Sequence, residues 1–178
     1  MTDKISPPFY ILTGPPGAGK TALLRALSQH TATVPEAARR VLANERATGG
    51  TATGDQDPAA FISRMRETQI RDYSQASGLT LFDRGLPDLL AFCRFYGVSD
   101  GAVRAAIPEH PYRPKVFFLP AWQAIYQQDA ERRLDFAGAE AFGALTQDGY
   151  IRSGYQLVDV PVGPLAARAA FVQARLEG

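Results

Sequence analysis

Cysteine is almost missing from this chain, which has only Cys93 among its 178 residues. A disulfide within the chain is therefore excluded, and the apolar run 89–93 around Cys93 favours a buried structural thiol over a nucleophile. Long apolar stretches are missing too, since none approaches the ~20 residues of a membrane span. Polar residues and Pro7-Pro8 precede the first short apolar run, unlike a signal peptide. We expect a cytoplasmic protein with no membrane partner.

An excess of charge of either sign is also missing. The chain has 19 basic and 18 acidic residues, for a formal net charge of +1. A general nucleic-acid binder needs a strong basic excess to offset phosphate charge, so that class of protein is excluded. The 46% of hydrophobic and 21% of charged residues are the balance of an ordinary globular protein. The length fits one domain spanning residues 1–178.

Short apolar runs alternate with stretches of helical periodicity along the chain. The runs predict five buried strands, and the stretches between and after them predict helices, the last of which covers 165–176. This alternation favours a parallel sheet covered on both faces, so we expect a three-layer α/β sandwich. Residues 47–57 are small, polar and rich in glycine, which predicts either a mobile loop or a plain surface linker. The expected strands cover residues 9–12, 31–34, 78–82, 116–119 and 155–160.

The turn between the first strand and the first helix carries a phosphate-binding motif. Residues 14–21 read G-P-P-G-A-G-K-T, which matches G-x-x-x-x-G-K-[ST]. The glycines let backbone N–H groups approach phosphate oxygens, and the following helix points its positive end at them. In this motif Lys20 binds the β and γ phosphates, and the hydroxyl of Thr21 ligates Mg²⁺. The predicted nucleotide site consists of Gly14, Pro15, Pro16, Gly17, Ala18, Gly19, Lys20 and Thr21.

The sequence says less about the base of the nucleotide than about its phosphates. The sequence has no N-K-x-D guanine motif, which favours ATP over GTP. The loop after the fifth expected strand, residues 161–164, is the nearest backbone that could contact the base. Gly163 permits close approach there, although the loop also reads as a rigid strand-to-helix turn.

Asp83 directly follows the third expected strand. An aspartate there fits the Walker-B position, where it holds or orients Mg²⁺; the alternative is an aspartate that caps a helix or turn. Arg84 and Asp88 follow at the carboxyl end of the strand, where ligands bind in open α/β sheets. We therefore expect Asp83 at the metal, and Arg84 and Asp88 at a second substrate.

Glu36 leaves the second expected strand at the same edge of the sheet. It is a candidate to bind an acceptor hydroxyl or to take its proton, and Arg39 and Arg40 are candidates to hold an anionic group. The alternative is a carboxylate favoured by the positive end of a helix, next to solvated arginines.

Residues 126–133 have two interpretations. At helical spacing Asp129 pairs with Arg132 and Arg133, as on an exposed ion-paired helix. Alternatively the segment is a lid, whose Arg132 closes over the transferring phosphoryl group as an arginine finger does.

Three segments together resemble a known family. Residues 14–21, V-P-E-A-A-R at 34–39 and F-D-R-G at 82–85 are similar to a small P-loop family of predicted ATPases, which look like the kinase domain of ribosylnicotinamide kinase. The resemblance covers most of the chain. It implies a nucleoside-kinase-like fold with strand order 2-3-1-4-5 and the machinery of phosphoryl transfer. Deoxynucleoside kinases also place a glutamate after the second strand and an acidic-Arg pair after the third, as Glu36, Asp83 and Arg84 are placed here.

Two functions of different classes remain. The first is a Mg²⁺-ATP-dependent kinase that acts on a hydroxyl of a nucleoside-like or other small metabolite. The second is an ATPase or nucleotide-dependent switch that binds a protein or a lipid head group. A polar acceptor pocket beside the γ-phosphate distinguishes them, because only the kinase needs one. For the kinase, the expected catalytic residues are Lys20, Asp83, Glu36 and Arg132, the expected acceptor pocket is Glu36, Arg39, Arg84 and Asp88, and the chain is a monomer or a homodimer.

Overall fold

The computed structural model describes residues 7–126 and 134–176. Their strands are β1 (Phe9–Thr13), β2 (Ala32–Val34), β3 (Thr80–Asp83), β4 (Lys115–Phe118) and β5 (Gln156–Asp159). They form one parallel sheet in the order β2-β3-β1-β4-β5. The predicted α/β sandwich and its strand order are confirmed. The helices are α1 (Lys20–Leu27), α2 (Ala37–Thr48), α3 (Pro58–Gln75), α4 (Asp88–Tyr96), α5 (Gly101–Ala106), the 3₁₀ helix η1 (Gln123–Ile125), α6 (Phe136–Arg152) and α7 (Leu165–Leu176).

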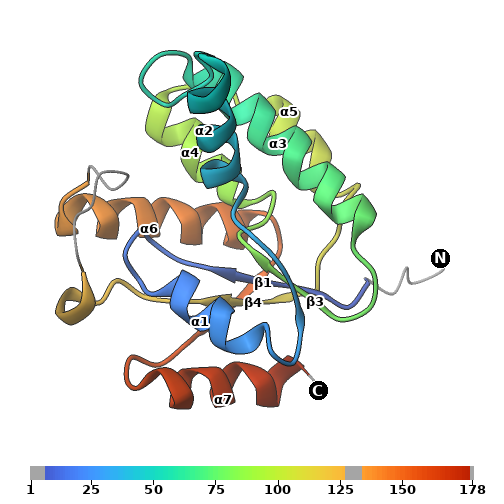
Figure 1. The fold of residues 1–178 in the computed structure, drawn as a ribbon, viewed down its shortest axis with the longest axis vertical. Helices are drawn as coiled ribbons and strands as arrows, with labels where there is room; N and C mark the ends of the chain where they lie inside the picture. The colour runs from blue at the N-terminus through green and yellow to red at the C-terminus, as the bar shows by residue number, and fades with distance from the viewer. Residues whose placement is uncertain (1–6, 127–133, 177–178) are drawn as a thin grey trace.

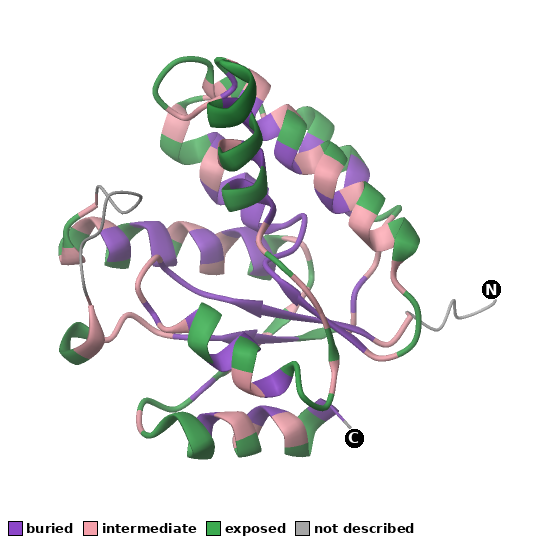
Figure 2. Cartoon of the chain, viewed as in Figure 1, coloured by how far each residue is buried: buried purple, intermediate pink, exposed green. Residues whose placement is uncertain are grey.

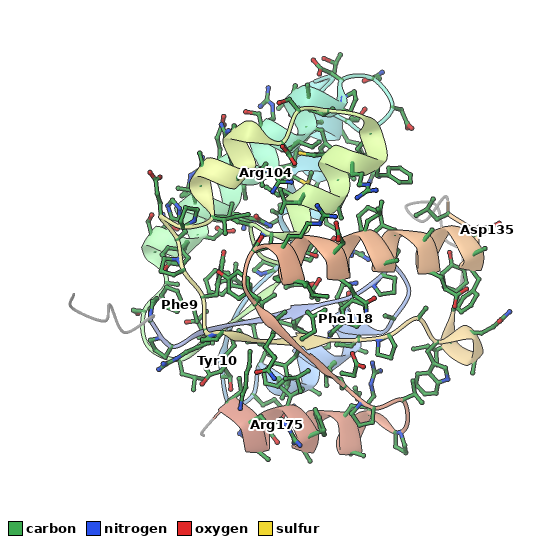
Figure 3. All side chains as sticks on the ribbon, turned by 180° about the vertical axis from the view of Figure 1, so that it is seen from behind. Phe9, Tyr10, Arg104, Phe118, Asp135 and Arg175 are labelled. Carbon is green, nitrogen blue, oxygen red and sulfur yellow. The ribbon has the colours of Figure 1, made fainter. Side chains whose placement is uncertain are left out.

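The helices cover the sheet from both sides. Helices α1 and α7 lie below it in the view of Figure 1, and α2 to α6 lie above it. Seen from behind, Phe118 on β4 lies between α6 on one side and α7 on the other (Figure 3). All five residues of β1 are buried, as expected for a strand inside a parallel sheet that is covered on both faces.

The two faces of the sheet bury alternate residues of β1. Phe9 and Ile11 pack in one core cluster with Tyr150 of α6, whereas Tyr10 and Leu12 pack in another with residues of α1 and α7. Successive side chains of a strand point to opposite faces, so one short apolar run supplies both layers. Figure 2 shows the result: the inner strands are buried between helices that bury their inner surfaces and expose their outer ones, whereas the edge strands β2 and β5 are partly exposed.

The loop between α2 and α3 is tied down at several points. Helix α2 takes in residues 47 and 48, which the sequence placed in a loop, and ends at Gly49 in the left-handed conformation (φ 68°). The buried carboxylate of Glu45 then accepts a hydrogen bond from the N–H of Ala52 over 3.0 Å. At the other end, Asp57 followed by Pro58 is a sequence pattern that predicts the start of a helix, and Asp57 indeed caps α3 by accepting from the N–H of Ala60.

Within the part of the chain that the structure describes, no helix combines the length and the apolar character needed to cross a bilayer.

Candidate active site

The P-loop joins β1 to α1 at the carboxyl edge of the sheet, and three of its glycines have positive φ. Gly14 has φ 144°, Gly17 has φ 80° and Gly19 has φ 84°, a region that side chains rarely allow. A Cβ on Gly14 would also collide with the backbone oxygen of Leu119, directly after β4. Gly14 therefore lies directly against the backbone that follows β4. The three glycines leave the backbone of the loop without side chains at these positions.

Lys20 lies within the P-loop rather than extending into solvent. Its Nζ donates to the carbonyl oxygens of Gly14 and Pro15 over 3.0 and 2.8 Å, and the residue is only 7% exposed. Burial, followed by the positive charge of nearby Arg84, lowers the pKa of Lys20 to about 8. The two carbonyl groups are neutral, so an anion bound beside Nζ of Lys20 would supply a counter-charge that they cannot.

Arg168 of α7 supports the P-loop through a hydrogen bond to its backbone. Its Nη2 donates to the carbonyl oxygen of Ala18 over 2.9 Å, its guanidinium carbon lies 5.7 Å from the ring centroid of Trp122, and it is 4% exposed. The ring of Tyr126 lies against Gly17, where a Cβ would come within 2.6 Å of it. Nothing in the sequence near residue 168 indicates a partner 150 residues away, so the contacts of Arg168 and Trp122 could not be predicted.

Asp83 is the last residue of β3 and pairs in register with Leu12, two residues before the P-loop. It is 7% exposed, and its Oδ1 is buried without a hydrogen-bond partner among the described residues. Burial, then the negative charge of Glu36, raises the pKa of Asp83 to about 6. A buried carboxylate oxygen without a partner, next to a phosphate-binding loop, is a group that a cation or a proton would satisfy.

Arg84 takes up an unusual backbone conformation beside this carboxylate. Among the described residues it is the only one besides glycine with positive φ, at 70°. Its Nε donates to Oε1 of Glu36 over 2.9 Å and its Nη1 to Oδ1 of Asp88 over 2.8 Å. Burial alone would raise the pKa of Glu36, but Arg84, Lys20 and Arg39 outweigh it and hold that pKa below its usual value. Glu36 is therefore an ionised carboxylate at neutral pH.

Asp88 lies behind Arg84 and is fully buried. Its two oxygens accept from Oγ1 of Thr13 (2.6 Å), from Arg84, from the N–H of Gly85 (2.9 Å) and from the hydroxyl of Tyr150. Four donors use up the acceptor capacity of a carboxylate. The sequence led us to expect Asp88 at a ligand, whereas in this structure it positions Arg84 and leaves the ligand-facing surface to Glu36 and Arg84.

One cavity of about 1150 Å³ brings several of these residues together. Its wall includes Gly17, Lys20 and Thr21 of the P-loop and α1 as well as Glu36, Arg39 and Arg84, so predicted phosphate and acceptor residues meet in one space. Asp83, Asp88 and Gly163 are not among the residues of its wall, and a Cβ on Gly163 would meet nothing within 4 Å. Arg40 turns away to Asp72 of α3. Arg132 lies outside the described residues.

Comparison with known sequences identifies a family. The sequence model of a family described as "AAA domain" matches residues 9–168. No curated protein sequence matches the chain.

Solved structures share the fold at low identity. A deoxyadenosine kinase from M. mycoides, with products dCMP and a flexible dCDP bound, is 12% identical, with a TM-score of 0.65 over 95% of this chain and 98% of that one. A shikimate kinase from Acinetobacter baumannii in complex with shikimate is 17% identical, with a TM-score of 0.61 over 98% and 93%. The NadR protein in complex with NR is 16% identical, with a TM-score of 0.67 over 97% of this chain and 50% of that one.

These comparisons confirm the resemblance that the sequence indicated. The family match covers the P-loop and every strand, and the three structures share the predicted P-loop kinase fold.

Proposed function

The chain belongs to this AAA-domain family, and from that premise we propose that it is a Mg²⁺-ATP-dependent kinase, which phosphorylates a hydroxyl of a nucleoside-like or other small metabolite in the cytoplasm. One observation carries the proposal: the cavity that begins at Lys20 and Thr21 continues to Glu36, Arg39 and Arg84. A kinase needs a polar acceptor pocket beside the phosphates, and a nucleotide-dependent switch does not.

The nucleotide would occupy the P-loop end of the cavity. Backbone N–H groups of residues 14–21 and the N-terminus of α1 would bind the phosphates, and Lys20 would exchange its two carbonyl partners for phosphate oxygens. The base would rest beside the loop that contains Gly163. Arg132 stays a predicted lid residue.

The residues present fit a bound Mg²⁺ ion. Proteins usually hold Mg²⁺ with one or two side-chain oxygens together with substrate phosphates. Thr21 lines the cavity, and the buried Oδ1 of Asp83 lacks a partner among the described residues; the hydroxyl of Thr21 and the carboxylate of Asp83 would hold the ion. When bound, Mg²⁺ neutralises charge on the phosphates.

In the proposed reaction, the γ-phosphoryl group passes from the nucleotide at the P-loop to the acceptor beside Glu36. The acceptor hydroxyl oxygen attacks the γ-phosphorus, the bond from that phosphorus to the bridging oxygen breaks, and ADP leaves with the electron pair. The hydroxyl proton passes to the carboxylate of Glu36 or of Asp83. Glu36, kept ionised by Arg84 and Arg39, suits orientation of the hydroxyl, and Asp83 is the alternative acceptor of its proton.

A screen of metabolites tests the proposal. The protein is incubated with Mg²⁺-ATP and pools of hydroxyl-bearing metabolites, and mass spectrometry follows any compound that gains a phosphoryl group. We expect one chemical class to be phosphorylated by the wild type and not by Lys20→Ala. ATP hydrolysis without a phosphorylated product in any pool would support the switch or ATPase alternative instead.

A further inference from the structure

The cavity has an aromatic end beyond its charged groups. That part of the wall is formed by Leu42, Phe61, Phe92, Phe95, Tyr96 and Phe142. Phe142 is next to the charged end, because the guanidinium carbon of Arg84 lies 5.9 Å from its ring centroid. The rings of Phe92 and Phe142 are 5.0 Å apart, and those of Phe92 and Tyr96 are 6.5 Å apart. A continuous aromatic surface therefore extends from Arg84 along α4.

Part of this aromatic surface is open to solvent. Phe95 is 45% exposed, although its ring packs edge-on against Tyr96 at 5.0 Å and lies 5.7 Å from Phe142. Small-molecule sites combine such an apolar and aromatic wall with a few polar groups that fix the orientation of the ligand. Here Arg84, paired with Glu36, lies next to Phe142, and further polar residues of the wall, among them Glu45 and Asp55, come from α2 and the loop after it.

The loop between α2 and α3, which also lines the cavity, is held in place by two contacts. Glu45, buried in α2, accepts from the N–H of Ala52, and a Cβ on Gly54 would collide with the hydroxyl oxygen of Tyr96. The loop between α2 and α3 is thus packed directly onto the aromatic surface. A preformed slot of this kind suits a flat ligand, because little further ordering is needed on binding.

The charges near the rings are already compensated. Glu36 is paired with Arg84 and Arg39, and Glu45 with Arg64 at 3.4 Å. Arg46 and Asp55, which also line the cavity, are not without interaction partners either. A further charge placed among the rings would lose its hydration without gaining a partner. The aromatic end therefore favours an uncharged ligand.

We infer that the phosphoryl acceptor is an alcohol that carries a neutral, planar aromatic ring. The ring lies against Phe92, Phe95 and Tyr96, and the hydroxyl reaches Glu36 beside Arg84. This inference rests on the proposed kinase function and narrows its substrate class. It excludes two classes of acceptor: polyols without an aromatic ring, and compounds that already carry a phosphate.

The test is calorimetric titration of the wild-type protein with a panel of probes, in the presence and in the absence of a non-hydrolysable ATP analogue. Adenosine, cytidine, uridine and pyridoxine are the neutral aromatic alcohols, ribose and shikimate lack an aromatic ring, and AMP is aromatic but charged. We expect at least one neutral aromatic alcohol to bind about tenfold or more tightly than ribose, shikimate and AMP. Tightest binding by one of those three, or binding by none of the panel, would overturn the inference.

Variants at an exposed position test the role of the ring itself. Phe95→Leu should weaken binding of the preferred probe about tenfold, and Phe95→Trp should retain it, because only the second keeps an aromatic face. Ile151→Ala is the matched control, since Ile151 is 62% exposed and is not part of the cavity wall. Equal affinity of Phe95→Leu and the wild type would also count against the inference.

Titration with Mg²⁺-ATP alone separates the two proposals. If the wild type binds an aromatic alcohol but not Mg²⁺-ATP, the kinase proposal fails and the assignment of the aromatic subsite stands. If it binds Mg²⁺-ATP but no aromatic alcohol, only the inference about the acceptor fails.

Discussion

Arg84 and Asp88 form a buried ion pair across one turn of chain, with Nη1 of the arginine 2.8 Å from Oδ1 of the aspartate and side chains that are 4% and 0% exposed. The other side of the guanidinium contacts Glu36. Arg84 is thus held between Asp88, which does not line the cavity, and Glu36, which does. This arrangement offsets the cost of its positive φ, which is of order 1–3 kcal/mol, and fixes where its charge lies.

Asp88→Asn should lower the free energy of unfolding by about 3 kcal/mol, measured by urea denaturation. The four groups around this carboxylate are all donors, so an amide NH₂ would face another donor and Arg84 would lose one of its two counter-charges. Asp100→Asn is the control, because Asp100 pairs with Arg104 on the exposed surface, where ion pairs contribute little. Equal effects of the two substitutions would show that the buried network is not stabilising.

Lys20→Ala should weaken binding of Mg²⁺-ATP by about 2–4 kcal/mol, since a charged contact to phosphate is lost. The fold should survive, because Lys20 lines the cavity and its amine bonds to carbonyl groups of its own loop and not to a distant element. Calorimetric titration measures the affinity, and circular dichroism checks the fold. Lys115→Ala, at an exposed lysine of β4, should bind like the wild type. Unchanged affinity of Lys20→Ala would rule out its role at the phosphates.

Asp83→Asn should retain nucleotide binding and lose phosphoryl transfer. The amide keeps the shape of the side chain, but it holds Mg²⁺ less strongly and accepts no proton. Parallel titration and turnover measurements separate the two effects. Transfer at the normal rate by this variant would make Asp83 a structural residue.

The same substitution should stabilise the nucleotide-free protein in a pH-dependent way. The pKa of Asp83 is raised in the folded state from 3.8 to about 6, so the folded protein binds this proton more tightly than the unfolded chain does. Ionisation of Asp83 therefore costs stability as pH rises from about 4 to 6. The gain in free energy of unfolding of Asp83→Asn over the wild type should grow across that interval to about 2–3 kcal/mol and then level off. Urea denaturation at pH 4, 5, 6 and 7 measures it; a constant difference would contradict the raised pKa.

Arg168→Met should weaken binding of ATP and of inorganic triphosphate by the same factor, about tenfold. Arg168 bonds to the backbone of the P-loop at Ala18, so its loss should disturb the phosphate site whatever the base. Arg175→Met is the control on the same helix, because Arg175 is exposed and stacks on Phe171. A loss confined to ATP would mean instead that Arg168 acts at the base.

Features with a local cause could be predicted from the sequence. The P-loop is a contiguous motif, Asp57-Pro58 begins α3 and Leu165–Leu176 forms the last helix, all as expected. The strand ends were predicted less accurately. Strand β3 begins at Thr80 and not at Gly78, because Gly78 turns the chain at φ 64° and pairing with β1 starts at Phe9.

Contacts between distant segments could not be predicted in this way. The position of Asp88 near the carboxyl end of the third expected strand suggested a ligand contact, but its partners Thr13 and Tyr150 lie 75 and 62 residues away. The carboxylate turns inward because those donors meet behind it. Likewise, the spacing of Phe61, Phe92 and Phe142 gives no sign that α3, α4 and α6 bring these rings to one cavity.

The bond from Arg168 to Ala18 also orders events during synthesis. Its partners are 150 residues apart, so at roughly 5–20 residues per second a ribosome needs about 8 to 30 seconds between making the P-loop and making the arginine that supports it. The hydrogen bond from the hydroxyl of Tyr10 to the carbonyl oxygen of Leu176 forms equally late. A nascent chain therefore has a nucleotide loop without this support until α7 is made, and the site is complete only once α7 has left the exit tunnel and docked beside α1.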